Sequence, residues 1–322
     1  MGIWYEVTPL DTLFFRGSEP MEAGQLTADA LFLLLVTVIQ GAVRTAVLKQ
    51  EGVSFQDYNA GREPSFVRER IGQSGTEAPF QVIGILFRKG GRIYAPAPAA
   101  WFVDLPNKPI AGRDVVGTQV RLPKWELPYS ELEIVLSSPK PPVVTAENEA
   151  FSLAGSWVDA TLLAEKAPVF KSDDVLMTSE LFQLENRVGI AMNEKRKVEQ
   201  GALYSSGHIR LREDMTMLVG LSKDLGLQKQ GRLQLGGEQR VCSYQLCASP
   251  SFPSNGSNRY CALSPVQGDQ EAVDSVLCSQ KPVVLAGWDM DKGFHKPSQT
   301  WLQAGSVFSK NIKNVCIALA CD

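Results

Sequence analysis

The sequence predicts an α+β fold of two domains. Its 322 residues suit two domains of ordinary size, and 44% hydrophobic residues are enough for two packed cores. The first half has the order strand, long helix and hairpin, and the second half has helix, hairpin and further strands. We expect the domains at residues 1–145 and 146–322, with a junction near residues 139–150.

The first elements are a strand and a long helix. Residues 3–7 alternate aromatic and polar side chains, which predicts a strand that Thr8-Pro9 ends. Thr27 is a candidate N-cap for a helix over residues 30–48, which stops at Gly52. The middle of this helix is apolar almost all round, so we expect it to pack between layers.

Gly90-Gly91 separates two strand-like segments, residues 80–89 and 92–97, and this pattern predicts a β-hairpin. Prolines interrupt the residues that follow and favour loops and edge strands there. The other expected elements are an exposed helix at 62–70, an amphipathic helix at 155–166, a hairpin at 181–212, and strands at 215–221, 241–247, 282–288 and 304–308.

Charge and hydropathy leave the ligand open. The net charge is −3 and the sequence pI is about 5.6, so an anionic polymer would need a local basic patch. The N-terminus lacks the pattern of a secretory signal, and the apolar run at residues 30–39 is half of the roughly 20 residues that a membrane-spanning helix needs. We expect a cytoplasmic protein that does not bind a membrane.

All six cysteines lie in the last quarter of the chain. Two pairs, Cys242 with Cys247 and Cys316 with Cys321, have a spacing that could be bent into a four-thiolate zinc site. A strand at 241–247 would put Cys242 and Cys247 on opposite faces, which favours reduced, buried cysteines instead. We expect no cofactor and no metal.

The chain carries few signs of catalysis. It has no phosphate-binding loop, no nucleophile-elbow motif and no zinc-protease motif. His208 and His295 are the only histidines, and RNA cleavage by acid-base chemistry would need one of them or a Lys or Tyr substitute. A lone histidine is more often a satisfied or surface residue. Asp289 and Asp291 could share a metal, but their place before Gly293 is more typical of a turn.

Two stretches suit RNA chemistry. Gly236-Gly237 lies between Arg232 and Arg240, which is typical either of a backbone that approaches phosphates or of a simple hairpin turn. The hairpin segment 187–212 has six Lys and Arg against two Glu, so it is locally basic. Such a hairpin is either a solvated turn or a surface for nucleic acid.

Two further positions have the same double interpretation. Phe14-Phe15-Arg16 is either a hydrophobic plug beside a surface charge or a corner that stacks bases and binds phosphate. Gly41 lets another backbone approach the long helix just where Arg44 emerges, and a packed strand or a bound ligand would both use that space.

Taken in order, six stretches resemble one family: residues 9–17, 41–46, 185–190 with 201–204, 235–240, 286–289 and 304–307. This family is the RAMP-superfamily subunit of type III-B CRISPR effector (Cmr) complexes, the third Cmr subunit. The chain departs from the family at its end, where residues 314–322 replace the usual glycine-rich segment.

The resemblance implies two ferredoxin-like (RRM-like) domains and a role in antiviral defence. One face would hold the repeat-derived 5′ handle of the CRISPR RNA (crRNA), and the hairpin at 181–212 would act as a protruding thumb beside the glycine-rich loop at 231–240. The implied partners are the crRNA, the large polymerase-like subunit and the first backbone subunit. The family subunit is not the nuclease of the complex.

The expected RNA contacts lie in or near these stretches, and each is a glycine, an aromatic residue, a serine or a positively charged residue. They are Phe15, Arg16, Gly41, Arg44, Arg187, Lys195, Arg196, Lys197, Tyr204, Arg210, Gly236, Gly237, Arg240, Lys296, Gly305 and Ser306. Two alternatives stay open: a metal-independent endoribonuclease that processes precursor crRNA, and a scaffold that only joins subunits.

Overall fold

The structure is a computed structural model. It describes residues 2–15, 36–124, 144–192, 198–252, 258–285, 288–289, 294–295 and 297–320, with the backbone alone at 191–192, 198–204, 288–289 and 294–295. The chain forms two compact units, and each is assembled from separate stretches of sequence. Unit 1 contains residues 1–82, 182–249 and 285–298, and unit 2 contains residues 83–181, 250–284 and 299–322. The expected junction at residue 145 falls inside unit 2.

The α+β class is confirmed, since both units combine antiparallel strands with short helices. Ferredoxin-like domains stay a prediction. The elements of unit 1 are β1 (Ile3–Pro9), α1 (Val36–Gln50), α2 (Phe55–Asn59), α3 (Ser65–Ile71), β8 (Phe182–Met192), β9 (Val198–Leu211), β10 (Met215–Leu221), β11 (Gln230–Gln234), β12 (Val241–Cys247), β17 (Trp288–Asp289) and β18 (Phe294–His295).

Strand β1 lies inside the sheet of unit 1, in the order β11-β12-β1-β10. Its alternating pattern buries Trp4, Tyr5 and Val7. Trp4 pairs with Gly220 of β10, where a Cβ would lie 2.6 Å from the indole ring. The absence of a side chain at Gly220 therefore makes room for the ring.

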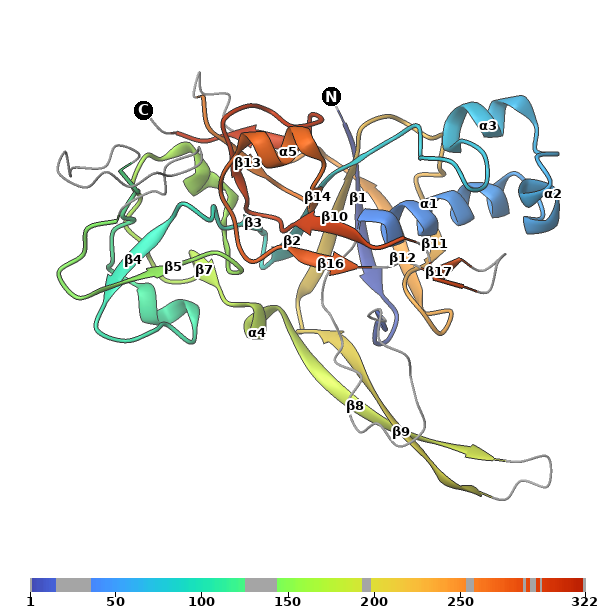
Figure 1. Cartoon of the computed structure of the whole chain (residues 1–322), viewed down its shortest axis with the longest axis horizontal. Coiled ribbons are helices and arrows are strands. Elements are labelled where there is room, and N and C mark those ends of the chain that lie inside the picture. The colour runs from blue at the N-terminus through green and yellow to red at the C-terminus, as the bar shows by residue number, and fades with distance from the viewer. Residues whose placement is uncertain are drawn as a thin grey trace. The chain divides into compact units, whose positions relative to one another are not determined.

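Helix α1 lies against this sheet and contacts β11 (Figure 1). It buries Ile39, Val43 and Val47 at helical spacing, and Ile39 and Val43 line an apolar cavity together with strand residues such as Tyr244. The expectation of a helix that is apolar almost all round is wrong for the described part, because Thr37, Gly41 and Lys49 are exposed. Residues 30–35 of the expected helix lie outside the described residues.

Strands β8 and β9 confirm the hairpin predicted at 181–212 and form a long two-stranded ribbon (Figure 1). Their register runs from Phe182 opposite Leu211 to Met192 opposite Val198. Alternation along the strands separates two faces. One carries the exposed side chains of Leu184, Val188 and Ile190, and the other carries most of the polar site described below.

Unit 2 is built from shorter strands. Its elements are β2 (Val82–Lys89), β3 (Arg92–Pro96), β4 (Phe102–Leu105), η1 (Gly112–Val115), β5 (Glu149–Ser152), β6 (Trp157–Asp159), η2 (Ala160–Ala164), β7 (Val175–Leu176), α4 (Thr178–Leu181), β13 (Tyr260–Ala262), β14 (Val266–Gln267), α5 (Gln270–Ser275), β15 (Val276–Cys278), β16 (Val283–Leu285), β19 (Gln299–Leu302), β20 (Val307–Phe308) and β21 (Cys316–Ala318). Strand β2 begins at Val82, the last residue of the first segment of unit 1, and β16 ends at Leu285, the first residue of the third segment of unit 1.

The hairpin β2-β3 is confirmed, with Lys89 opposite Arg92 and positive φ angles at Gly90 and Gly91. The predicted helix at 155–166 is wrong. Trp157 and Val158 instead pair with β3 and β7, because aromatic and β-branched side chains fit a sheet, and only the short 3₁₀ turn η2 follows.

A core cluster of Ala262, Val266, Leu302, Phe308 and Ile312, among others, holds the C-terminal strands of unit 2 together. The strand predicted at 304–308 is shorter than expected, because Ala304 and Gly305 form a turn before β20. No helix among the described residues is long and apolar enough to cross a membrane.

Candidate nucleic-acid interface

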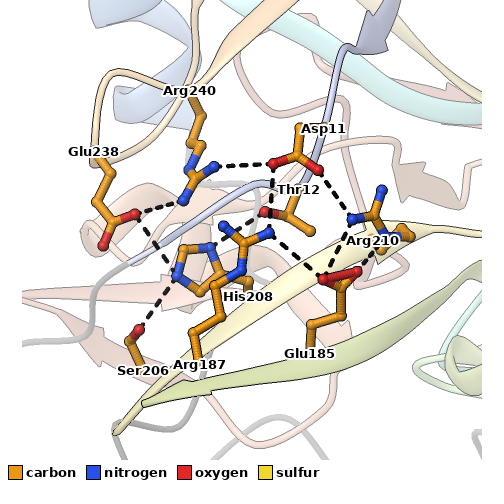
Figure 2. A network of polar contacts seen from close by, with 9 residues as sticks. All are labelled: Asp11, Thr12, Glu185, Arg187, Ser206, His208, Arg210, Glu238 and Arg240. Carbon is orange, nitrogen blue, oxygen red and sulfur yellow. Dashed lines mark hydrogen bonds and ion pairs between the residues drawn. The ribbon is translucent and has the colours of Figure 1, made fainter. Parts of the chain in front are cut away.

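A network of polar side chains joins three segments of unit 1 that are far apart in sequence (Figure 2). The segments are the chain after β1, the hairpin β8-β9 and the loop between β11 and β12. The members of the network are Asp11, Thr12, Glu185, Arg187, Ser206, His208, Arg210, Glu238 and Arg240.

Main-chain hydrogen bonds bring the three segments together. The N–H of Leu13 donates to the carbonyl of Ile209, and the N–H of Ile209 donates back to Leu13, both at 2.8 Å. The N–H of Gly237 donates to the carbonyl of Phe14 at 2.8 Å. The segment after β1 therefore lies beside the hairpin on one side and beside the glycine loop on the other.

The glycine pair makes this contact possible. A Cβ at Gly236 would lie 2.4 Å from the carbonyl oxygen of Phe14, and Gly236 has a φ of +82°. A Cβ at Gly237 would lie 2.9 Å from the Phe14 ring. The loop is a hairpin connection, closed by a hydrogen bond from the N–H of Leu235 to the carbonyl of Arg240, and its glycines serve close packing against Phe14.

Asp11 is the centre of the network, because three arginines contact its carboxylate. Oδ1 accepts from Nη2 of Arg210 at 2.9 Å. Oδ2 accepts from Nη1 of Arg240 at 3.1 Å and from Nη2 of Arg187 at 3.4 Å. The hydrogen bond from Arg210 is the main cause that holds the pKa of Asp11 below its ordinary value.

Two further carboxylates complete the charge balance. Glu185 accepts from Nε and Nη2 of Arg210, and this pairing is the main cause that lowers the pKa of Glu185. Glu238 accepts from Nη2 of Arg240 at 2.6 Å. Three guanidinium groups thus face three carboxylates, so the cluster has many directed donors but little net charge.

His208 lies beneath the cluster and is almost completely buried, with 1% of its side chain exposed. Nδ1 lies 3.3 Å from the hydroxyl of Thr12, and Nε2 lies 3.2 Å from that of Ser206. The Phe14 ring stacks on the imidazole at a centroid distance of 5.0 Å. Burial is the main cause that lowers the pKa of His208, while the charge of Glu238 opposes that shift.

The exposed arginines can bind an anionic group. The side chains of Arg187 and Arg210 are 37% and 40% exposed, whereas that of Arg240 is 18% exposed. Guanidinium donors match phosphate oxygens in geometry and charge. The described residues hold no group of side chains suited to a metal ion, and burial raises the pKa of the Cys242 thiol to about 12.

The structure brings together five of the residues expected from the sequence: Arg187, Arg210, Gly236, Gly237 and Arg240. Phe15 lies next to them, but its ring is buried and packs against Gly236. The hydrophobic plug is therefore the arrangement seen for this ring.

The other described candidates are not members of the network. Arg44 donates from Nε to the carbonyl of Ile71 and from Nη2 to that of Thr76, so it fixes a loop. Gly41 is exposed, and a Cβ there would meet nothing within 4 Å. In unit 2, Gly305 packs against the carbonyl of Ala97, and Ser306 is buried with its hydroxyl donating to Gln303.

Several candidates cannot be placed. Arg16, Lys195, Arg196, Lys197 and Lys296 lie outside the described residues, and for Tyr204 only the backbone opposite Gly189 is described. Their roles stay predictions.

Sequence reasoning missed the acidic members of the network, namely Asp11, Glu185 and Glu238. It considered His208 either as a possible catalyst or as a satisfied or surface residue, and did not connect it with the arginines. One signal was available: Ser206, His208 and Arg210 alternate along the predicted strand, so they had to share a face. The contact of that face with Asp11 has no local signal.

The sequence profile of a family of CRISPR-associated proteins, Cas_Cmr3, matches residues 5–266. None of the curated protein sequences matches the chain. Solved structures similar to the chain include two from electron cryomicroscopy of the type III-B Cmr-beta complex with cognate target RNA. The chain in the complex that also holds AMPPnP (state 1) is 15% identical, with a TM-score of 0.56 over 95% of this chain and 85% of that one.

The chain in the complex with target RNA alone is 16% identical, with a TM-score of 0.55 over 95% of this chain and 86% of that one. At these identities the two structures show a shared fold. The profile match covers most of the chain, in the same region as most of the sequence stretches that suggested the family. This chain therefore belongs to the Cas_Cmr3 family of CRISPR-associated proteins.

Proposed function

We propose that this chain is an RNA-binding subunit of a type III-B CRISPR effector complex and that it holds the 5′ handle of the crRNA. The observation that carries the proposal is the convergence of Arg187, Arg210 and Arg240 beside the Gly236-Gly237 loop, in a chain of the Cas_Cmr3 family. The similar chains belong to complexes solved with cognate target RNA, which supports RNA as the ligand class.

The physical account is local. The whole chain has a net charge of −3, so attraction of RNA must come from a few directed contacts. Arginine side chains at the cluster would take phosphate oxygens, and unstacked bases would meet the hairpin. Weak binding by the isolated chain is acceptable in an assembly, because neighbouring subunits hold the same RNA and raise the effective concentration.

The proposal includes two protein partners and a cytoplasmic location. We infer that the chain contacts the large polymerase-like subunit and the first backbone subunit. We also infer that it has two ferredoxin-like domains and a role in antiviral defence. Pull-down of each partner with the tagged chain, before and after RNase treatment, separates direct contacts from contacts made through RNA.

The test of handle binding compares RNAs with the natural 5′ handle and with a scrambled handle of equal composition, at several salt concentrations. We expect weak, salt-sensitive binding that prefers the natural handle and strengthens when the large subunit is added. Arg210→Ala should reduce affinity and lower the slope of log K against log salt by about 1, and Arg240→Ala should also reduce affinity. Arg62→Ala is the matched control, because Arg62 lies in the same unit but pairs only with Asp57 among the described residues.

Two outcomes would overturn the proposal. The first is equal affinity for natural and scrambled handles together with full protection of the crRNA 5′ end in a complex that lacks this chain. The second favours a pure scaffold: unchanged RNA binding in both Arg240→Ala and the triple alanine variant of Lys195, Arg196 and Lys197.

We also propose that the chain is not a nuclease. His208 supports this view, because it is buried and both ring nitrogens lie near hydroxyl groups, so it is not presented to a substrate. Incubation of the purified chain with repeat RNA should give no cleavage. Cleavage that disappears in His295→Ala or in His208→Ala would instead support an endoribonuclease.

A further inference from the structure

We propose that Asp11 is a positioning residue for RNA: its carboxylate holds three guanidinium groups together so that the remaining donors of the two exposed ones, Arg187 and Arg210, can bind one phosphate group. This inference deepens the proposed function and rests on it. It assigns a role to an acidic residue at a site for a polyanion, where charge alone would make that residue unfavourable.

The geometry gives the first argument. Guanidinium groups from β8, β9 and the loop before β12 all contact the Asp11 carboxylate, at 3.4, 2.9 and 3.1 Å. Three like charges this close repel one another, and a carboxylate between them offsets the repulsion. Without it, Arg187 and Arg210 have only Glu185 as a shared acidic partner among the described residues.

The donors that remain give the second argument. Within the described part of the chain, Arg187 makes its contacts through Nη2, and Arg210 makes its contacts through Nε and Nη2. Nη1 of both side chains is left for a ligand, and both side chains are more than a third exposed. Two neighbouring arginines with outward donors match the several oxygens of one phosphate.

Arg240 has a different part in the arrangement. Its side chain is mostly buried, it bonds both Asp11 and Glu238, and its Nε is buried without an acceptor in the described structure. It therefore fixes Asp11 from the protein side, while Arg187 and Arg210 present their donors outward. Asp11 connects this buried arginine to the exposed pair.

Two hypotheses for Asp11 predict opposite changes in RNA affinity when its charge is removed. If Asp11 only competes with phosphate for the arginines, its removal tightens RNA binding. If it positions them, Asp11→Asn weakens RNA binding even though it removes a negative charge. We expect a loss of affinity for handle RNA of roughly tenfold, equal to about one phosphate contact, and a shallower salt dependence.

Asp57→Asn is the matched control. Asp57 has the same exposed fraction as Asp11, 48%, lies in the same unit and pairs with a single arginine, Arg62. The control variant has the same charge change, so any general electrostatic gain appears in it as well. We expect it to bind handle RNA at least as tightly as the wild type.

A double-mutant cycle separates positioning from a general loss of stability. In the Arg210→Ala background, Asp11→Asn should cost much less affinity than in the wild type, because one of the groups that it positions is gone. Fully additive losses would overturn the inference, as would wild-type or tighter binding by Asp11→Asn. If Asp11→Asn does not fold, Asp11→Glu replaces it, since the charge is kept but displaced: weaker binding supports the inference, and unchanged binding overturns it.

The same titrations distinguish this inference from the proposed function. No preference of the wild type for handle RNA means that the proposed function is wrong. A clear preference that depends on Arg240, together with wild-type affinity in Asp11→Asn, means that only the role of Asp11 is wrong.

Discussion

Asp11 and Arg240 form an ion pair, with Oδ2 and Nη1 3.1 Å apart, across 229 positions of the sequence. This pair fastens the segment after β1 to the loop before β12. The same carboxylate reaches Arg210 on β9, so the hairpin shares the connection. The proposed RNA site therefore depends on three segments at once, and the following variants test its parts.

Gly236→Ala should destabilise the protein by about 1–3 kcal/mol, because the new methyl group meets the Phe14 carbonyl and the backbone has a positive φ. Chemical denaturation gives the free energy of unfolding. Gly61→Ala is the control for the backbone term alone, since Gly61 also has a positive φ but a Cβ there meets nothing within 4 Å. Equal losses in the two variants would show that close packing on Phe14 is unimportant.

Gly41→Ala should stabilise the protein by about 0.5–1 kcal/mol, because alanine favours an exposed helix interior and its methyl group has open space. Thermal unfolding checks this rise. RNA titration of the same variant tests the predicted contact at Gly41. Lower affinity in a more stable protein identifies a contact, whereas unchanged affinity removes Gly41 from the site.

Arg44→Lys should lower the free energy of unfolding by about 1 kcal/mol, because one ammonium group cannot replace both hydrogen bonds to the carbonyls of Ile71 and Thr76. We expect RNA affinity to stay the same, since the guanidinium group is already engaged. Arg62→Lys at an exposed ion pair is the control for stability. A loss of RNA affinity without a loss of stability would return Arg44 to the list of contacts.

Stability should depend on pH through His208. Its pKa is lowered by burial from the ordinary value of 6.5, so the unfolded chain binds this proton more readily than the folded chain. Stability is therefore full above pH 6.5 and falls as the pH drops through 6.5 toward the folded pKa. Chemical denaturation at pH values from about 7.5 to about 5, which extend roughly one unit or more to each side of the ordinary histidine pKa, measures this change in stability.

His208→Gln should flatten this pH dependence, and His295→Gln is the matched control because these are the only two histidines. If His208→Gln keeps the pH dependence of stability, the group that titrates is not His208. Asp11 and Glu185 do not interfere in this range, because their pKa values are held below 3.8 and 4.5, and the stability that their ionised forms contribute is lost only at lower pH.

Elements with a short-range signal were predictable from the sequence. The hairpin around Gly90-Gly91, the long hairpin and the strand at 215–221 follow from period-two patterns and turn residues. The helix at 155–166 failed, because Trp157 and Val158 satisfy their backbone by pairing with other strands. Tertiary contacts decided that segment, and local pattern could not reveal them.

The site was only half predictable for the same reason. Arg240 could be selected because it follows the Gly236-Gly237 pair, and Arg187 and Arg210 could be selected because they lie in a locally basic hairpin. Asp11 is a single acidic residue in a loop, and its meaning comes from partners on strands that follow much later. The burial of His208 likewise depends on Phe14 stacking on its ring, and no spacing in the sequence encodes that contact.

The place of β1 between β10 and β12 has a consequence for biosynthesis. A ribosome makes β1 first, but its two neighbours are complete only at residues 221 and 247. Until residue 247 is made, β1 lacks at least one of its two neighbouring strands. The closure of unit 1 must therefore wait for a long-range pairing of the kind that slows folding. We expect nascent chains that stop before residue 247 to expose Trp4 and Tyr5 and to recruit chaperones.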